Sequence, residues 1–274
     1  MALTILENQA PSMAAVVSQL CTQAQFETDE YEQWRQEMGL HFSYHRKHWE
    51  FAFILQALKQ TGMLVSGKTG LGFGVGREPL ACVMAKSGCE LVATDLAARA
   101  ARSLGWLRSK QHARSLRSLF WKGICDWEFF QKHVRFRAVD MNDIPSDIGN
   151  YDFVWSACAL EHLGSLAKGS AFVSNSLGCL KPGGVAVHTT EYNAMSDSRT
   201  VDNDGTVLYR KRDILELARQ AAERGYDVTL NFTEGQLPAD QFIDVPPFRD
   251  CPHLRMLVKG FITTSFGLII SRTA

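Results

Sequence analysis

The glycine-rich stretch Thr69–Gly76, with the sequence TGLGFGVG, constrains the fold more than any other part of this chain. A short apolar run leads into Gly72, Gly74 and Gly76, and a helix is predicted to begin directly after them at Arg77. Glycines let the backbone approach a ligand closely, and the N–H groups that converge where a strand turns into a helix suit a nucleotide-like molecule. Because such a triplet also occurs in ordinary turns, its meaning depends on the segments that follow.

Two further apolar runs, residues 91–94 and 136–139, each end in an acidic residue. In a doubly wound sheet, Asp95 would lie at the tip of the second strand, where its carboxylate can accept hydrogen bonds from both hydroxyls of a ribose. At the tip of the third strand, Asp140 could accept from the exocyclic amine of an adenine while an apolar neighbour covers the ring. Two such acids in series indicate a nucleoside, although simple capping of turns would also explain them. The candidates at these strand ends are Asp95, Leu96, Asp140, Met141 and Asn142.

Two more segments continue the series: a predicted fourth strand at Tyr151–Ser156, and a Lys-Pro-Gly-Gly turn within Leu180–Gly184. Together with the glycines and the strand-end acids, over roughly residues 67–271, this ordered set resembles the class I S-adenosylmethionine-dependent methyltransferases. The resemblance implies an α/β fold, a doubly wound and mostly parallel seven-stranded sheet in the order 3-2-1-4-5-7-6 whose last strand is antiparallel. It implies S-adenosyl-L-methionine as the cofactor, with Gly72, Gly74, Gly76 and Ser156 added to the strand-end candidates as cofactor-binding residues.

The residue patterns and the spacing between the motifs also indicate how the chain is divided. Residues 1–60 are expected to form an N-terminal helical cap, with helices over 11–23, 28–38 and 44–60 and Ser43 capping the third. Residues 61–274 would form the Rossmann-like domain, with insertions at about 99–133 and 233–252. The first insertion is basic and amphipathic, and it could serve a homodimer, a phosphate, an acidic lipid or only a solvated helix face.

One position departs from the family pattern. Its members usually carry an acidic residue two positions before the first motif glycine, where this chain has Gly70. Another group would then hold the amino-acid end of the cofactor, and the segment 41–49 concentrates aromatic and cationic side chains that could do so. Arg46 is our cofactor-binding candidate there and Tyr44 a substrate-binding one. An amphipathic helix with a solvated cationic face is the alternative interpretation.

The segment after the fourth strand is where we expect the chemistry, because open α/β sheets bind ligands at the carboxyl ends of their strands. His162 is a candidate general base with Glu161 beside it, and Cys158 is a substrate-facing candidate. In some methyltransferase families a similar stretch carries a metal motif of the form Glu-x-x-Glu-His. Here Cys158 replaces the first Glu, so a divalent metal is an alternative that we do not favour. Structural roles for Glu161 and His162 also stay open.

The predicted fifth strand, 185–190, runs out into polar residues. Unpaired polar atoms on a buried parallel strand cost roughly 1–3 kcal/mol each, so polar residues there indicate a site or a self-satisfied hydrogen-bond cluster. We take Glu191 as a catalytic candidate and assign the others to substrate binding. These substrate-binding candidates are His188, Tyr192 and Asn193.

Composition limits the partners. The 274 residues carry 29 basic and 29 acidic side chains, and this neutrality argues against a nucleic-acid partner. The N-terminus MALTILENQA has no pattern of a signal peptide, and no apolar stretch approaches the length of a membrane span. Seven cysteines without CxxC spacing read as reduced thiols, so we expect a cytoplasmic protein.

The function expected from these observations is methyl transfer to a small or medium-sized acceptor by in-line displacement. A hydroxyl oxygen is the preferred acceptor, because a general base such as His162 is most useful there. The alternatives are an N- or carboxyl-methyltransferase, an RNA methyltransferase, an NAD-type dinucleotide-binding oxidoreductase, and a binding protein that keeps the fold without turnover.

Overall fold

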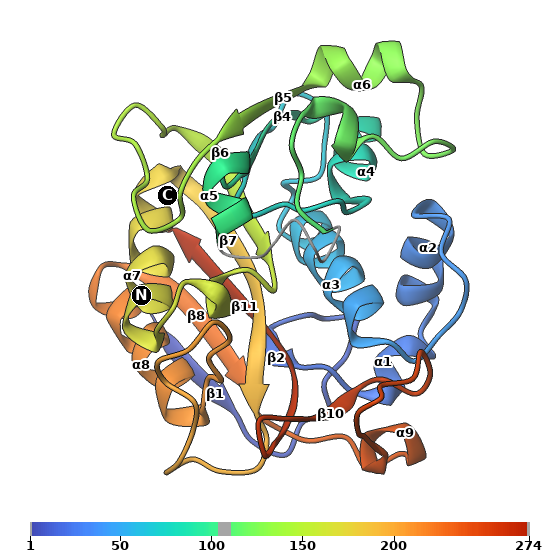
Figure 1. Ribbon diagram of the computed structural model, residues 1–274, viewed down its shortest axis with the longest axis vertical. Coiled ribbons are helices and arrows are strands. Elements are labelled where there is room, and N and C mark those ends of the chain that lie inside the picture. The colour runs from blue at the N-terminus through green and yellow to red at the C-terminus, as the bar shows by residue number, and fades with distance from the viewer. Residues whose placement is uncertain (1, 104–110, 273–274) are drawn as a thin grey trace.

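A mixed sheet flanked by helices forms the centre of the molecule (Figure 1). The computed structural model describes residues 2–103 and 111–272. The parallel strands of the sheet are, in spatial order, β5 (Val134–Ala138), β4 (Glu90–Asp95), β3 (Thr69–Gly72), β6 (Tyr151–Ala157) and β7 (Leu180–Asn193). Strand β11 (Phe261–Arg272) pairs antiparallel with β7, and β8 (Tyr226–Asn231) pairs with the end of β11. The predicted α/β class is confirmed, and the seven predicted strands keep their relative order.

Four short strands were not predicted, and they extend the sheet to eleven strands within the described residues. Strand β1 (Leu3–Leu6) lies parallel to β8, and β2 (Ser18–Leu20) lies between β8 and β11. Strand β10 (Arg255–Val258) pairs with the start of β11, and β9 (Ile243–Asp244) pairs with β10. Such short edge segments carry no clear alternation of apolar and polar residues, because their conformation is set by pairing with the rest of the sheet.

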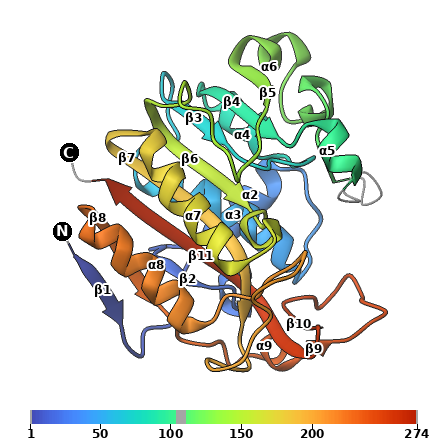
Figure 2. The same cartoon turned by 60° about the vertical axis from the view of Figure 1, so that its left-hand side comes forward.

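Helices cover both faces of the sheet (Figure 2). Helices α3 (Arg46–Gln60), α4 (Leu80–Lys86) and α6 (Trp127–His133) pack on one face, and α7 (Leu166–Ser176) and α8 (Lys211–Glu223) pack on the other. Strand β6 serves both apolar layers because side chains alternate along a strand: Phe153 and Trp155 join the α3 side, and Val154 joins the α7 side. The smaller helices are α1 (Gln23–Phe26), α2 (Asp29–Glu37), α5 (Ala98–Ser103) and α9 (Pro238–Gln241), with 3-10 turns at 116–119, 160–162 and 177–179.

The N-terminal helices differ from the prediction in two places. The helix expected over 11–23 is wrong, since this segment holds β2 and only reaches α1 at Gln23. The third helix begins at Arg46, not at 44, and its cap is His45, whose Nδ1 accepts a hydrogen bond from the Lys47 N–H at 3.1 Å. Ser43 instead donates its hydroxyl to the carbonyl of Asp250. The second helix is confirmed, with the hydroxyl of Thr28 as its cap.

Helix α3 positions the site. Residues 49–58 of this helix are buried, which fits its place across β6, β7 and β11 (Figure 1). Its first turn therefore brings Arg46 and Lys47 toward the carboxyl ends of β6 and β7. The second insertion holds α9 and β9 and docks on this turn, where the Arg46 N–H donates to the carbonyl of His253 at 3.1 Å.

The first insertion lies after β4. In its described part, the guanidinium of Arg117 packs over the ring of Trp127 at 4.4 Å. The segment 104–110, which carries Arg108 and Lys110 of this basic insertion, lies outside the described residues. Across residues 2–103 and 111–272, none of the helices combines the length and the apolar character that crossing a membrane requires.

Candidate active site

A cavity of about 330 Å³ opens at the carboxyl ends of β3, β4, β5 and β6. Open α/β sheets bind their ligands at this edge, because the loops that leave the strands diverge there. Nine of the candidate residues from the sequence line the cavity. They are Gly74, Gly76, Asp95, Leu96, Asp140, Met141, Asn142, Cys158 and His162.

The glycine turn forms one wall of this cavity. Gly74 has a φ of +57°, and a Cβ added there would lie 2.8 Å from the Cβ of Ala159 and 3.0 Å from the sulfur of Met141. Both the conformation and the space therefore require a glycine. Gly72 lies behind this wall, against the ring of Trp155, and does not line the cavity.

Asp95 is fixed at the tip of β4. Its two carboxylate oxygens accept hydrogen bonds from the N–H groups of Leu96, at 2.7 Å, and Ala113, at 2.8 Å. Burial raises the pKa of this carboxyl, and these N–H groups together with His112 oppose the rise. The carboxylate is thus oriented before any ligand arrives, and an ionised carboxylate has further lone pairs for ligand hydroxyls.

Asp140 and Met141 follow β5 at the same edge. The carboxylate of Asp140 is exposed and accepts from the N–H of Asn142 at 2.8 Å. Met141 is buried in the apolar layer next to Val139, and both line the cavity. A hydrogen-bond acceptor therefore lies beside an apolar wall, an arrangement suited to a heteroaromatic ring with an amino group.

His162 lies on the wall formed by the segment after β6. Its Nδ1 is 2.9 Å from the carbonyl oxygen of Gly205 and 3.2 Å from the hydroxyl of Thr206. A carbonyl oxygen can only accept, so this contact places the hydrogen of a neutral ring on Nδ1. The lone pair of the neutral ring is then on Nε2.

Glu161 is adjacent in sequence but does not line the cavity. It is 1% exposed, and the hydroxyl of Thr190 donates to its Oε2 at 3.3 Å. Burial raises the pKa of its carboxyl, which the neighbouring His162 counteracts.

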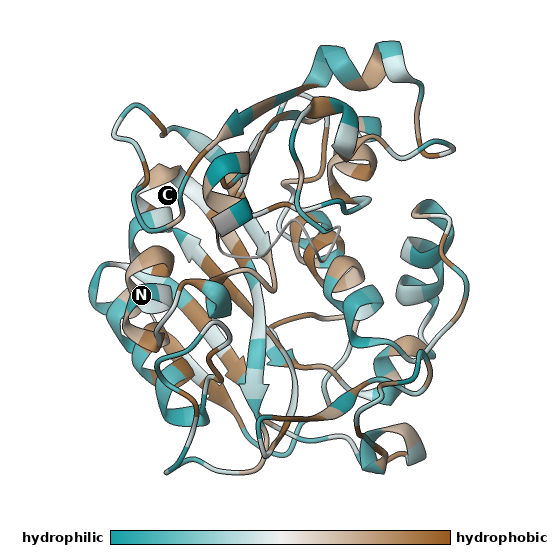
Figure 3. Cartoon of the chain, in the orientation of Figure 1, coloured by the Kyte–Doolittle hydropathy of each residue, from teal (hydrophilic) through white to brown (hydrophobic). Residues whose placement is uncertain are grey.

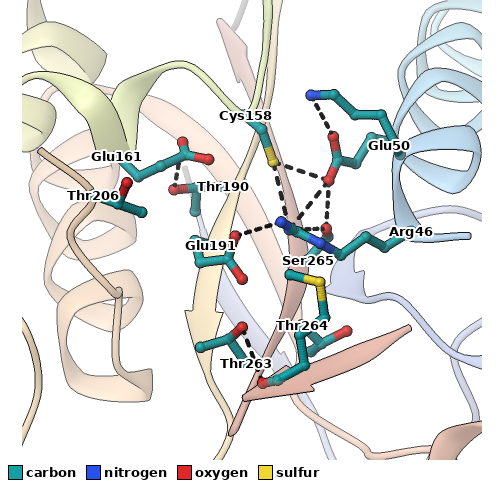
Figure 4. A network of polar contacts seen from close by, with 12 residues as sticks. Arg46, Glu50, Cys158, Glu161, Thr190, Glu191, Thr206, Thr263, Thr264 and Ser265 are labelled. Atoms are coloured by element: carbon teal, nitrogen blue, oxygen red, sulfur yellow. Dashed lines mark hydrogen bonds and ion pairs between the residues drawn. The ribbon is translucent and has the colours of Figure 1, made fainter. Parts of the chain in front are cut away.

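A buried polar network lies between α3 and the ends of β6, β7 and β11 (Figure 4). Arg46 forms an ion pair with Glu191 at 2.7 Å and donates to the hydroxyl of Ser265 at 3.1 Å. The thiol of Cys158 donates to Glu50 at 2.9 Å, and Arg46 lies 3.6 Å from the same carboxylate. This network accounts for Glu191 at the end of β7, a part of the strand that is hydrophilic in Figure 3 although it is buried.

The charges of the network set its pKa values. Burial alone would lower the pKa of Arg46, but Glu191 and other neighbours raise it, so the guanidinium stays charged. Burial likewise opposes ionisation of Glu50, whereas Lys47 and Arg46 lower its pKa below the usual range. Burial raises the pKa of the Cys158 thiol, which therefore keeps its proton.

Two of the candidates lie deep under the site. His188 is fully buried, with its ring 2.8 Å from the hydroxyl of Ser156 and 3.3 Å from that of Ser176. Burial lowers the pKa of this histidine to about 3. Neither Ser156 nor His188 lines the cavity, so His188 belongs to an internal hydrogen-bond cluster beneath it.

The remaining substrate candidates also lie away from the cavity. The hydroxyl of Tyr44 donates to Glu27 at 2.9 Å. Tyr192 packs against Phe232 and Phe266, and burial raises its pKa. The amide of Asn193 donates to the carbonyl of Arg199 at 3.0 Å and so holds the loop after β7 in place.

The sequence interpretation missed several residues that line the cavity. The principal ones are Lys47, Phe51, Glu78, Gln111 and His112. Lys47 lies next to Arg46 in the cationic segment, and Glu78 follows the last glycine by two positions. Their places in the sequence could therefore have identified both residues as candidates. Gln111 and His112 lie in an insertion that has no recognisable motif.

No group of three or more His, Cys, Asp and Glu side chains that could hold a metal ion occurs in the described parts of the chain. The side chains of Glu161 and His162 lie in different surroundings. Glu161 is buried against Thr190, whereas His162 lines the cavity.

A family model described as "Methyltransferase domain" matches residues 42–231. Among solved structures, one assigned as a sarcosine dimethylglycine methyltransferase from Galdieria sulphuraria is 15% identical, with a TM-score of 0.49 over 81% of this chain and 84% of that one. Magnesium protoporphyrin IX methyltransferase from Synechocystis PCC 6803 is 13% identical, with a TM-score of 0.46 over 90% of this chain and 96% of that one. No protein with a curated description matches the chain.

Proposed function

The chain belongs to the family of methyltransferase domains whose model matches residues 42–231, and from this premise we propose that it methylates a hydroxyl oxygen of a small or medium-sized acceptor. The protein is an S-adenosylmethionine-dependent methyltransferase. This cofactor, when bound, supplies a methyl group made electrophilic by the attached sulfonium.

The residues of the cavity fit this cofactor. Asp95 would hold the ribose hydroxyls, and Asp140 with Met141 would hold the adenine. The turn at Gly74 leaves a cradle that a Cβ would fill, and the buried Oε2 of Glu78 has no hydrogen-bond partner, so a donor from a ligand would satisfy it.

The larger share of the rate enhancement should come from alignment. Orientation of the two reactants can supply about 7–11 kcal/mol, whereas a general base contributes about 10²–10⁴-fold in rate. The walls of the cavity, including Phe51 and Leu163, would hold the acceptor and exclude water. The small residue Cys158 lies on the same wall, with its thiol turned to Glu50.

His162 is our proposed general base, and its orientation is the observation that carries the proposal. Because Nδ1 donates to the carbonyl of Gly205, the lone pair on Nε2 is the one that can take the proton of a hydroxyl. Glu161, next to it, would stabilise the imidazolium that forms.

The test replaces this histidine. We expect His162→Ala to lower kcat about 10²-fold or more and to leave the affinity for S-adenosylhomocysteine unchanged, because the ring acts on the acceptor. Release of S-adenosylhomocysteine would be measured with a panel of alcohols, phenols, carboxylic acids and amines. The surface variant His133→Ala, on α6, is the matched control and should keep full activity.

Two outcomes would contradict the proposal. Full activity of His162→Ala would remove the histidine from the mechanism. If the enzyme methylates only the amines or only the carboxylic acids of the panel, the acceptor atom is not a hydroxyl oxygen.

We also propose a cytoplasmic location. All seven cysteines are free thiols, and thiols persist in a reducing compartment. A balance of 29 basic and 29 acidic residues supports a small molecule as the acceptor over a nucleic acid.

A further inference from the structure

The position at which the family carries an acidic residue cannot hold one in this chain. A Cβ added to Gly70 would lie 2.3 and 2.4 Å from ring atoms of Phe153 and 2.8 Å from Leu91. No side chain fits there unless the apolar layer under β3 moves. The charged groups for the amino-acid end of the cofactor must therefore come from elsewhere on the cavity wall.

Lys47 is a basic residue and Glu78 an acidic residue on that wall. The Lys47 ammonium lies 3.7 Å from Oε1 of Glu78, 3.1 Å from Glu50 and 3.4 Å from the carbonyl of Ala157. The side chain of Glu78 is 11% exposed, and its buried Oε2 has no hydrogen-bond partner. A buried carboxylate oxygen without a donor is costly, and a cationic ligand would satisfy it.

We propose that Lys47 and Glu78 together hold the amino-acid end of S-adenosylmethionine, Lys47 through the carboxylate and Glu78 through the ammonium of the cofactor. Once Glu78 has released its proton, the carboxylate of the ligand faces the Lys47 ammonium and the ammonium of the ligand faces the Glu78 carboxylate. This inference rests on the proposed cofactor site and assigns two residues to it.

Glu78 is suited to such a partner. Burial raises the pKa of its carboxyl to about 8, and the nearby Glu50 and Asp95 add to the rise while Lys47 opposes it. Near neutral pH the carboxyl therefore carries a proton before the cofactor arrives. A ligand ammonium at this place would favour the ionised form, so binding would release that proton.

Arg46, the candidate chosen from the sequence, serves a different role. Its guanidinium is held by Glu191 and Ser265 (Figure 4), and Arg46 does not line the cavity. Lys47, one position later on α3, lines the cavity instead. Arg77 is a second cationic residue on the cavity wall, and its side chain is exposed. It is therefore the alternative partner for the carboxylate of the cofactor, and the test includes it.

The experiment measures binding by calorimetry with four ligands. They are S-adenosylhomocysteine, its decarboxylated analogue, its deaminated analogue, and 5′-methylthioadenosine, which lacks both groups. We expect Lys47→Met to lower the affinity about 10–100-fold for ligands that keep the carboxylate and not for the decarboxylated analogue. Glu78→Gln should lower it by a similar factor only for ligands that keep the amino group.

Proton release on binding provides a second readout. It would not change if Glu78 had only a structural role. Wild-type protein should release a proton on binding S-adenosylhomocysteine near pH 7, measured in buffers of different ionisation enthalpy, and Glu78→Gln should release less. Lys59→Met on the same helix and Glu90→Gln at the start of β4 are matched controls that should bind all four ligands as the wild type does.

The outcomes separate the two proposals. If the wild type binds S-adenosylhomocysteine but neither variant discriminates among the ligands, the roles of Lys47 and Glu78 are wrong and the cofactor site stands. If Arg77→Met lowers the affinity only for ligands that keep the carboxylate, and Lys47→Met does not, then Arg77 and not Lys47 binds the carboxylate of the cofactor. If the wild type binds none of the four ligands, the cofactor site itself is wrong.

Discussion

Glu78 makes the stability of the protein without cofactor depend on pH. Its folded pKa of about 8 lies above the usual 4.5, so the folded protein keeps a proton that the unfolded chain would lose. The stability from this group is complete below about pH 4.5 and is lost as the pH rises through about 8. Glu78→Gln, which mimics the protonated form, should be more stable than the wild type at pH 8.5 by roughly 2 kcal/mol or more.

Urea denaturation at pH 5 and pH 8.5 checks this prediction. The two proteins should have similar free energies of unfolding at pH 5 and should differ at pH 8.5. An equal difference at both values would mean that Glu78 does not titrate in this window. Glu90→Gln, which alters an exposed carboxyl, should show no such dependence.

At the level of single residues, the sequence predicted what lies at the ends of strands. Asp95, Asp140 and Met141 follow apolar runs, and the parallel sheet brings them to one edge. Lys47 could not be told from Arg46, because the choice depends on where α3 begins and which way each side chain turns. The start of α3 at Arg46 is set by the cap at His45, which the sequence pattern did not reveal.

At the level of elements, Arg46 joins α3 to the sheet through buried charges. Its side chain is 15% exposed, and it pairs with Glu191, which is 4% exposed. Arg46→Met should destabilise the protein by about 3–5 kcal/mol, because Glu191 would keep a buried charge without a partner. Urea denaturation at pH 7 measures this loss.

A surface pair provides the control for Arg46. Arg137 and Asp147 form two hydrogen bonds of 2.8 and 2.9 Å on the surface, where solvent screens the charges, so Arg137→Met should destabilise the protein far less than Arg46→Met. Adding Glu191→Gln to Arg46→Met should restore part of the stability. If Arg46→Met and Arg137→Met lower the free energy of unfolding equally, the buried Arg46–Glu191 pair stabilises the protein no more than the surface pair does.

The long elements were predictable and the short ones were not. Strand β6 and helix α3 have apolar patterns of sufficient length, and both were predicted within a few residues. Strand β2 has the sequence SQL, and its polar side chains are buried because Ser18 donates to the carbonyl of Ile269 and Gln19 to that of Ser12. These partners are distant in the sequence or lie in a loop, so no local pattern could indicate them.

At the level of the whole molecule, the site depends on three distant parts of the chain. Lys47 comes from the N-terminal segment. So does Arg46, which meets Cys158 after β6, Glu191 on β7 and Ser265 on the last strand (Figure 4). The order of the strands followed from the family resemblance. The place of Gln111 and His112 on the cavity wall did not follow from it, since this place depends on the hydrogen bond between the Ala113 N–H and Asp95.

The central claim is that the strand ends bind S-adenosylmethionine, and calorimetric titration with S-adenosylhomocysteine tests it most directly. We predict one site per chain in the wild type, an affinity lowered about 10–100-fold in Asp95→Asn through loss of the ribose contacts, and no heat with NAD. Absence of binding to the wild type, or binding of NAD in its place, would contradict the account.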